Sequence, residues 1–393
     1  MPFIWLLPIL LALACLGWAL GLWRARAVVG GRTSRLHSRP PYHAAMVALA
    51  TALPPLALAI LWGLLAGKAP PALVPLGLAL AGMALAASRI APDLRARNHV
   101  EQAIRAGLLA CSLIAIATTA GIVLSLVFES AHFFRLYPWH DFLFGTTWLP
   151  AFSGGSELGI LPLLWGTLYI SAIALAFAVP VGLMAAIYMA DYASPRIRGM
   201  VKPLIEVLAG IPTIVYGLFA LMTVGPLLRD WVARPTGLGE SSSSVLTAGL
   251  VMGVMLIPFV SSLSDDIINA VPQSLRDGSL GLGATSSETI RKVVIPAALP
   301  GIVGAVLLAA SRAIGETMIV VLGAGAMARI SPNPFEAMTT ITVKIVGQLT
   351  GDNDFASPET LVAFALGLTL FVLTLALNVL ALYITRRYRE QYE

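Results

Sequence analysis

An arginine and a glutamate, Arg312 and Glu316, lie four residues apart inside a long apolar stretch. A charge at the centre of a bilayer costs ~2.5–3.5 kcal/mol on insertion scales, so each side chain needs a partner or a water-filled path. On a helix this spacing puts both on one face, where they can pair. Two interpretations follow. The pair is a structural ion pair, or it marks a pathway or gating position for an anion that Arg312 attracts.

The polar stretch that precedes this apolar run predicts two short helices. Pro272 suits the first turn of a helix, where its missing N–H costs nothing, and Gly283 is expected to end that helix. Thr285 and Glu288 have the spacing of a capping box, which begins a second helix that we expect Pro296 to end. Together the two helices would form a protruding elbow. A merely structured loop is the alternative.

The composition requires a membrane around these features. Of 393 residues, 58% are hydrophobic and 11% are charged, and the mean hydropathy is +0.85. Soluble domains carry about 25% charged residues. A soluble enzyme, a nucleic-acid-binding domain and a disordered chain are therefore excluded. Cys15 and Cys111 both lie in apolar runs and predict no disulfide framework.

Windows of roughly 20 apolar residues predict about nine transmembrane helices, because lipid offers no partner to unpaired backbone groups. They cover about 3–23, 44–66, 71–88, 106–128, 163–190, 204–225, 245–262, 298–325 and 361–385. Pro54, Pro55, Pro180 and Pro212 fall inside them and mark expected kinks.

The basic residues predict the orientation. Of the 25 lysines and arginines, 18 fall on one side of the predicted spans and 6 on the other, and Arg312 lies within a span. Loops rich in lysine and arginine stay on the cytoplasmic side of the membrane. We therefore expect the amino terminus outside and the carboxyl tail in the cytoplasm. Glu206 then lies near the inner end of its span, where it would reach water, pair with Lys202 or make a gating contact between helices.

Two parts are expected along the chain. Residues 1–105 hold three helices with no charge inside the membrane, and the sequence assigns this membrane extension no role. Residues 106–393 hold six helices and every feature with chemistry.

Several kinds of site are not predicted. The near-match to a phosphate-binding loop at Gly63–Lys68 lacks the right spacing and the preceding strand. His132 and His140 are accompanied by aromatic residues such as Phe133 and Trp139, which we interpret as an interfacial belt rather than a metal site. We expect no metal, no cofactor bound by this chain and no enzymatic activity of its own.

The elbow resembles the coupling loop of ABC importer permeases. That loop has Glu-Ala-Ala, three residues, Gly, nine residues and Ile-x-Leu-Pro. The matching positions here are Asp277, Gly278, Ser279, Gly283, Val293, Ile295 and Pro296. Asp277 replaces the glutamate, Gly278 and Ser279 replace the alanines, and Val293 and Ile295 replace the apolar pair, all mild changes. The resemblance implies that 272–295 docks into a groove of an ATPase subunit.

The apolar stretch after the elbow resembles one branch of these permeases. The run from Arg312 through Glu316 to Thr317 is similar to the signature of phosphate ABC importer permeases, and 203–217 is similar to the PstC type. The resemblance covers about 106–393 and implies a substrate pathway at Arg312, Glu316 and Thr317.

The resemblance further implies an all-α integral membrane protein with the type I importer (MetI-like) core, located in the cytoplasmic (inner) membrane. It implies a PstB-type ATPase homodimer that uses the ATP, a second permease of PstA type, an extracytoplasmic PstS-type phosphate-binding protein, surrounding membrane lipid and no nucleic acid. Three alternatives stay open. The substrate is another oxyanion such as sulfate, molybdate or phosphonate; the chain reports phosphate supply through 1–105; or it is an ion-coupled carrier, which the elbow disfavours.

Overall fold

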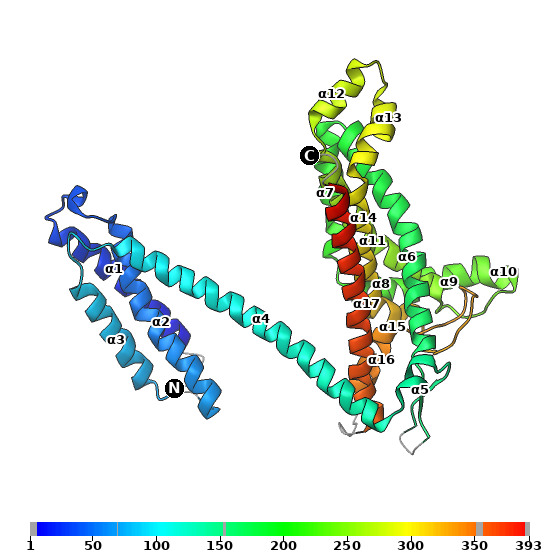
Figure 1. Ribbon diagram of the computed structural model, residues 1–393, viewed down its shortest axis with the longest axis horizontal. Coiled ribbons are helices and arrows are strands. Elements are labelled where there is room, and N and C mark those ends of the chain that lie inside the picture. Colours follow the sequence, from blue (N-terminus) through cyan, green and yellow to red (C-terminus); the bar gives the residue numbers. More distant parts are fainter. Residues whose placement is uncertain (1–5, 69, 152–154, 351–356, 390–393) are drawn as a thin grey trace. The chain divides into compact units, whose positions relative to one another are not determined.

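A computed structural model describes residues 6–68, 70–151, 155–350 and 357–389, and within these ranges the regular elements are helices apart from two strands of two residues (Figure 1). The chain divides into two compact units, Met1–Gly121 and Ile122–Glu393. The division falls inside one continuous helix, α4, as does the boundary at 105/106 expected from the sequence.

The first unit holds three helices and the start of the fourth. They are α1 (Leu6–Val28), α2 (Pro40–Ala66), α3 (Leu73–Ser88) and α4 (Ala96–Leu136). Small residues let these helices approach closely: a Cβ on Gly82 would lie 2.2 Å from the backbone oxygen of Ala50. Such close packing replaces the hydrophobic effect as the source of association in lipid.

The second unit contains the remaining elements. They are α5 (Trp139–Phe144), β1 (Trp148–Leu149), β2 (Glu157–Leu158), α6 (Leu161–Ile187), α7 (Pro195–Gly210), α8 (Thr213–Phe219), α9 (Gly225–Leu228), α10 (Arg234–Thr236), α11 (Val245–Asn269), α12 (Gln273–Gly281), α13 (Ser286–Thr289), α14 (Ile295–Ile314), α15 (Met318–Gly323), α16 (Ile341–Leu349) and α17 (Pro358–Arg389). The strands pair antiparallel, with Trp148 opposite Leu158.

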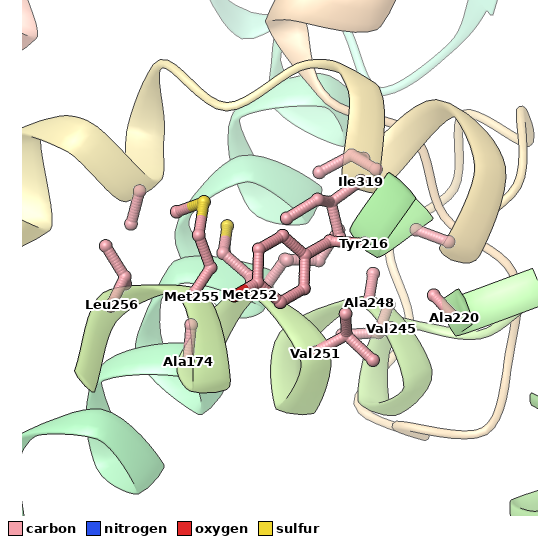
Figure 2. Packing of buried hydrophobic residues seen from close by; sticks show 14 of the residues in the cluster. Ala174, Tyr216, Ala220, Val245, Ala248, Val251, Met252, Met255, Leu256 and Ile319 are labelled. Carbon is pink, nitrogen blue, oxygen red and sulfur yellow. The ribbon is translucent and has the colours of Figure 1, made fainter. Parts of the chain in front are cut away.

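Helix α11 lies at the centre of the second unit. It packs along α6, where Gly249 and Gly253 face Ile173 and Phe177 so closely that a Cβ would come within 3 Å. Figure 2 shows the ring of Tyr216 among Met252, Met255 and other side chains of α11 and Ile319 of α15. This buried cluster contains residues of α6, α8, α11, α14 and α15, and so it packs these helices together.

Seven helices of the described residues are long and apolar enough to span a membrane, or eight if one bent pair is a single span. The nine expected spans all coincide with helical segments, although α3 has only 16 residues. Residues 3–5 of the first expected span lie outside the described part.

One expected span is sharply bent. The helical segments Pro195–Gly210 and Thr213–Thr236 meet at 88°. Pro212 pushes Ile211 into an extended conformation, φ −71° and ψ 127°, so the helix must end there. The kink predicted at Pro212 is therefore confirmed. In contrast, α2 continues through its two inner prolines and α6 through Pro180.

The segment between α4 and α6 corrects the expected aromatic belt. Phe133 is fully buried and its ring packs against Phe134, Tyr137 and Phe142 at centroid distances of 5.2–5.5 Å. Trp139 alone of this group is largely exposed. The chain turns back at Pro138, which lets α5 fold its aromatic face onto the end of α4 and bury these rings.

Candidate functional site

The first helix of the elbow, its turn and the start of its second helix form as the sequence predicts. Helix α12 begins after Pro272, and Gly283 follows it with φ +86°, a left-handed conformation that favours glycine. Thr285 and Glu288 form both hydrogen bonds of the capping box. No residue of α12 is buried, and Leu282 is 91% exposed. The elbow thus presents a free apolar surface, at one end of the second unit (Figure 1).

The expected end of the second elbow helix at Pro296 is wrong. From Ser286 to Ile314 the chain is one helix. A π-helical segment, Ile290–Val294, links α13 to α14, and the wider turn lets Pro296 enter the first turn of α14, where its missing N–H is tolerated. The elbow is therefore continuous with the apolar helix that carries Arg312.

Arg276, which the sequence analysis did not single out, fixes the elbow to the helices above it. Its guanidinium forms an ion pair with Asp191 in the π-helical segment after α6, and it donates a hydrogen bond of 2.8 Å to the backbone oxygen of Ile268 at the end of α11. Within the elbow, the hydroxyls of Ser279 and Thr289 lie 2.9 Å apart. These contacts fix α12 to the ends of α6 and α11.

A buried carboxylate joins α7 to α11. Asp265 is fully buried and accepts hydrogen bonds from Arg198 at 3.0 and 3.1 Å and from Lys202 at 2.8 Å. Lys202 also contacts Asp266. The suggested pairing of Lys202 with Glu206 is therefore wrong: two carboxylates on α11 take the ammonium group. The sequence feature that could have indicated this cluster is the pair of adjacent acidic residues, Asp265 and Asp266, at the end of an apolar run.

The helix that carries Arg312 breaks before it reaches Glu316. Helix α14 ends at Ile314, and α15 begins at Met318. The prediction that Arg312 and Glu316 share a helix face and pair is therefore wrong; among the described residues no ion pair joins them.

Each of the two charges has a different environment. Arg312 is exposed, and its guanidinium lies 5.1 Å from the ring centroid of Phe259, a cation–π contact that leaves its charge uncompensated. Glu316 is 9% exposed and accepts a hydrogen bond of 3.1 Å from the backbone N–H of Met318. Its own backbone oxygen accepts one from Thr342.

The break between α14 and α15 consists of Gly315, Glu316 and Thr317. Gly315 is the carboxyl cap of α14, and Thr317 precedes α15 with its hydroxyl 3.4 Å from the backbone oxygen of Gly315. Nearby, α16 contributes Lys344, whose ammonium group donates to the backbone oxygen of Ala326 at 3.2 Å. Burial lowers the pKa of Lys344.

Glu206 lines a mostly apolar pocket of 260 Å³ with Ala209 of α7 and with Pro258, Phe259, Ser262 and Leu263 of α11. Phe259 therefore contributes both to the pocket of Glu206 and to the contact with Arg312. The structure brings Glu206 and Arg312 to the same aromatic side chain, and it places Glu316 in the break between α14 and α15.

A second pocket, of 540 Å³, lies beside the small sheet. Its lining includes Tyr137, His140, Asp141 and Glu157. His140 and Asp141 approach to 3.5 Å, and His132 is not part of the lining. In the part of the chain that the structure describes, no group of three or more His, Cys, Asp or Glu side chains could hold a metal ion.

Residues 178–390 match the family described as the binding-protein-dependent transport system inner membrane component, over more than half of the chain. The chain belongs to this family. The permease also matches, over 7–76, a family described as phosphate ATP-binding cassette transporter. The permease is thus a multi-pass inner-membrane protein and the membrane component of an ABC transporter.

Curated relatives agree along most of the permease. It is 32% identical over 297 residues to the phosphate transport system permease protein PstC of Mesorhizobium japonicum, covering 71% of this chain and 88% of the relative. It is 38% identical over 252 residues to PstC 1 of Mycobacterium tuberculosis, covering 59% and 74%. It is 32% identical to the probable ABC transporter permease protein YqgH of Bacillus subtilis, covering 71% and 88%.

A solved structure shares the fold of the permease. A bacterial alginate ABC transporter, crystallised in complex with an alginate-bound periplasmic protein, matches with a TM-score of 0.50 and 16% identity, covering 74% of this chain and 97% of the other. The all-α fold with a type I importer core is confirmed.

Proposed function

We propose that the chain is the transmembrane permease subunit of an ATP-driven importer of inorganic phosphate. The observation that supports this most directly is its identity of 32–38% to phosphate transport system permeases of several organisms. The match of 7–76 to a phosphate transporter family supports it independently, because that region lies outside the importer core.

Arg312 is the proposed contact for the oxyanion. Its guanidinium is exposed, and its aromatic neighbour holds it in place without cancelling its charge. A guanidinium presents paired N–H donors that match phosphate oxygens. Glu316 and Thr317, at the helix break, complete the proposed pathway. Glu316 orients the first turn of α15 and Thr317 adds a hydroxyl.

The elbow is the proposed coupling surface. Asp277, Gly278, Ser279 and Gly283 would dock on a PstB-type ATPase dimer, and Ile295 and Pro296 would carry the movement into α14. ATP would be bound and hydrolysed only there, so this chain itself would need no cofactor and catalyse no reaction. A PstA-type permease and a PstS-type phosphate-binding protein complete the proposed assembly.

Coupling requires that ATP favour one state of the pathway over the other. Moving an equilibrium from 1:99 to 99:1 takes ~5.5 kcal/mol of differential binding. The ion pair of Arg276 with Asp191 and the cluster around Asp265 tie the elbow, α6, α7 and α11 together, so a force on the elbow would shift the whole group. Glu206, in the pocket beside Phe259, would sense this shift as a gating contact.

The test is ATP-dependent uptake of labelled phosphate into vesicles that hold the permease with its ATPase, partner permease and binding protein. Uptake that resists excess sulfate and molybdate is expected. If excess sulfate or molybdate abolishes the uptake, the chain is still an importer permease, but its substrate is that oxyanion rather than phosphate.

A further inference from the structure

The charge of the permease is unevenly divided along the chain. Residues 1–105 hold ten basic and two acidic residues, whereas 106–393 hold 15 basic and 18 acidic residues. The first part is therefore strongly positive although the second is slightly negative.

Nine of these ten basic residues lie in two connections, 24–43 and 89–105, and all nine are arginines. The two connections are held side by side. The backbone N–H of His37 donates to the backbone oxygen of Pro92 at 2.9 Å, and the N–H of Arg97 donates to the hydroxyl of Ser38 at 3.2 Å.

Apolar packing reinforces these hydrogen bonds. Leu36 of the first connection and Ile90 of the second are buried in one cluster with Ala25 and Val29 of the α1 end. Figure 1 places the α1–α2 connection beside the start of α4, at one end of the first unit. The arginines on the two connections therefore share one preformed platform.

Seven arginines of this platform precede α4, and six of them are exposed and have no carboxylate within 4.0 Å among the described residues. These six are Arg26, Arg32, Arg35, Arg39, Arg89 and Arg95. In the second unit, by contrast, Arg198, Lys202, Arg276 and Lys292 all form ion pairs. The second unit compensates much of its basic charge internally, and the platform does not.

We propose that the arginine platform binds the phosphate groups of anionic phospholipids such as phosphatidylglycerol. The six arginines lie in the last turn of α1 or in the connections between the apolar helices α1 to α4. Clusters of four to eight basic residues next to membrane helices attract anionic lipid. Lysine residues would set the orientation of the helices in the membrane equally well. A set made only of arginine fits paired hydrogen bonds to phosphate oxygens.

Spin-labelled lipids test the proposal. The full-length permease is reconstituted in phosphatidylcholine vesicles, and its association with spin-labelled phosphatidylglycerol is compared with that of spin-labelled phosphatidylcholine. Selectivity for phosphatidylglycerol that weakens as salt rises is expected. Wild-type protein without such selectivity would overturn the proposal, and this arm needs no variant.

Variants locate the selectivity. Replacing the six arginines by glutamine is expected to abolish the selectivity, because each arginine contributes up to about fivefold to the association of the anionic lipid. Replacement by lysine should retain part of it, and Arg386→Gln with Arg387→Gln on α17 should leave it unchanged. Selectivity that survives the six glutamines would refute the platform as its source. Displacement of the lipid by inorganic phosphate at constant ionic strength would make this a free-anion site instead, and overturn the lipid assignment.

Discussion

At the residue scale, the permease separates two kinds of charge. The guanidinium of Arg312 is exposed and lies on an aromatic ring, so its charge is available to a ligand. The carboxylate of Asp265 is fully buried, and two basic side chains compensate it. The first arrangement suits transient contact with an anion. The second suits a permanent joint between helices, because a buried charge is stable only when paired.

Arg312→Gln should lower phosphate uptake. Glutamine keeps hydrogen bonds but removes the charge, and hydrogen bonds to charged groups contribute about 1.5–3 kcal/mol, or roughly ten- to a hundredfold. The rate of ATP-dependent uptake at low phosphate measures this. Arg312→Lys is the control and should retain part of the rate. Wild-type uptake and wild-type coupling in the glutamine variant would remove Arg312 from the pathway.

The double variant Arg198→Met with Lys202→Met should lower the free energy of unfolding by about 3–5 kcal/mol, because Asp265 would remain buried without a charged partner. Thermal unfolding in detergent measures the effect. The matched control is Lys292→Met, which breaks the exposed pair with Glu288 and should change stability by less than about 1 kcal/mol. Equal losses in both variants would contradict the assignment of Asp265 as the joint.

At the element scale, the elbow is a rigid extension of the helices rather than a loose loop. Its second helix runs without interruption into α14, and Arg276 fixes its first helix to the ends of α6 and α11. Movement of the elbow is therefore expected to reach the helix break near Arg312 directly.

Arg276→Asp alone should uncouple ATP hydrolysis from transport, because it places two carboxylates where the ion pair was. The exchange Arg276→Asp with Asp191→Arg should restore part of the coupling, since it rebuilds the pair in reverse. The ratio of ATP hydrolysed to phosphate transported measures coupling. If the single variant hydrolyses no more ATP per phosphate transported than the wild type, the ion pair has no role in coupling ATP hydrolysis to transport.

Two glycines of the elbow provide a matched pair. Gly283 has φ +86°, which costs an alanine about 1–2 kcal/mol, whereas Gly278 lies inside α12 with open space around it. Gly283→Ala should weaken binding of the ATPase subunit, measured in detergent. Gly278→Ala should stabilise α12 by up to ~1 kcal/mol and preserve its shape. The opposite order of the two effects would show that the turn at Gly283 does not shape the docking surface.

At the scale of the whole molecule, the permease contains two units with separate cores. The first unit is packed through glycines and small apolar residues, and the second around α11. A packing defect in one unit should therefore stay within it.

Gly82→Ala tests this separation. Its Cβ would lie 2.2 Å from the backbone oxygen of Ala50, so α2 and α3 must move apart, whereas Gly77→Ala on the same helix meets only open space. Hydrogen exchange should rise in 1–121 for Gly82→Ala and stay unchanged in 122–393. Gly77→Ala should match wild type throughout. Faster exchange in both units would show that they unfold together.

The amino-acid sequence by itself determined the membrane location, the all-α fold, the kink at Pro212, and the turn and capping box of the elbow. These properties depend on composition and on contacts between residues close in the chain: an apolar run of membrane length, a proline, a capping box and a glycine with positive φ.

Only the tertiary structure decided the partners of the charges. The sequence spacing paired Arg312 with Glu316 and Lys202 with Glu206, and both pairings are wrong, because α14 breaks before Glu316 and because α11 brings Asp265 to Lys202. A spacing of four residues predicts a contact only while one helix continues. A charge in a membrane takes the partner that lies nearest in space, and helices far apart in the chain supply it.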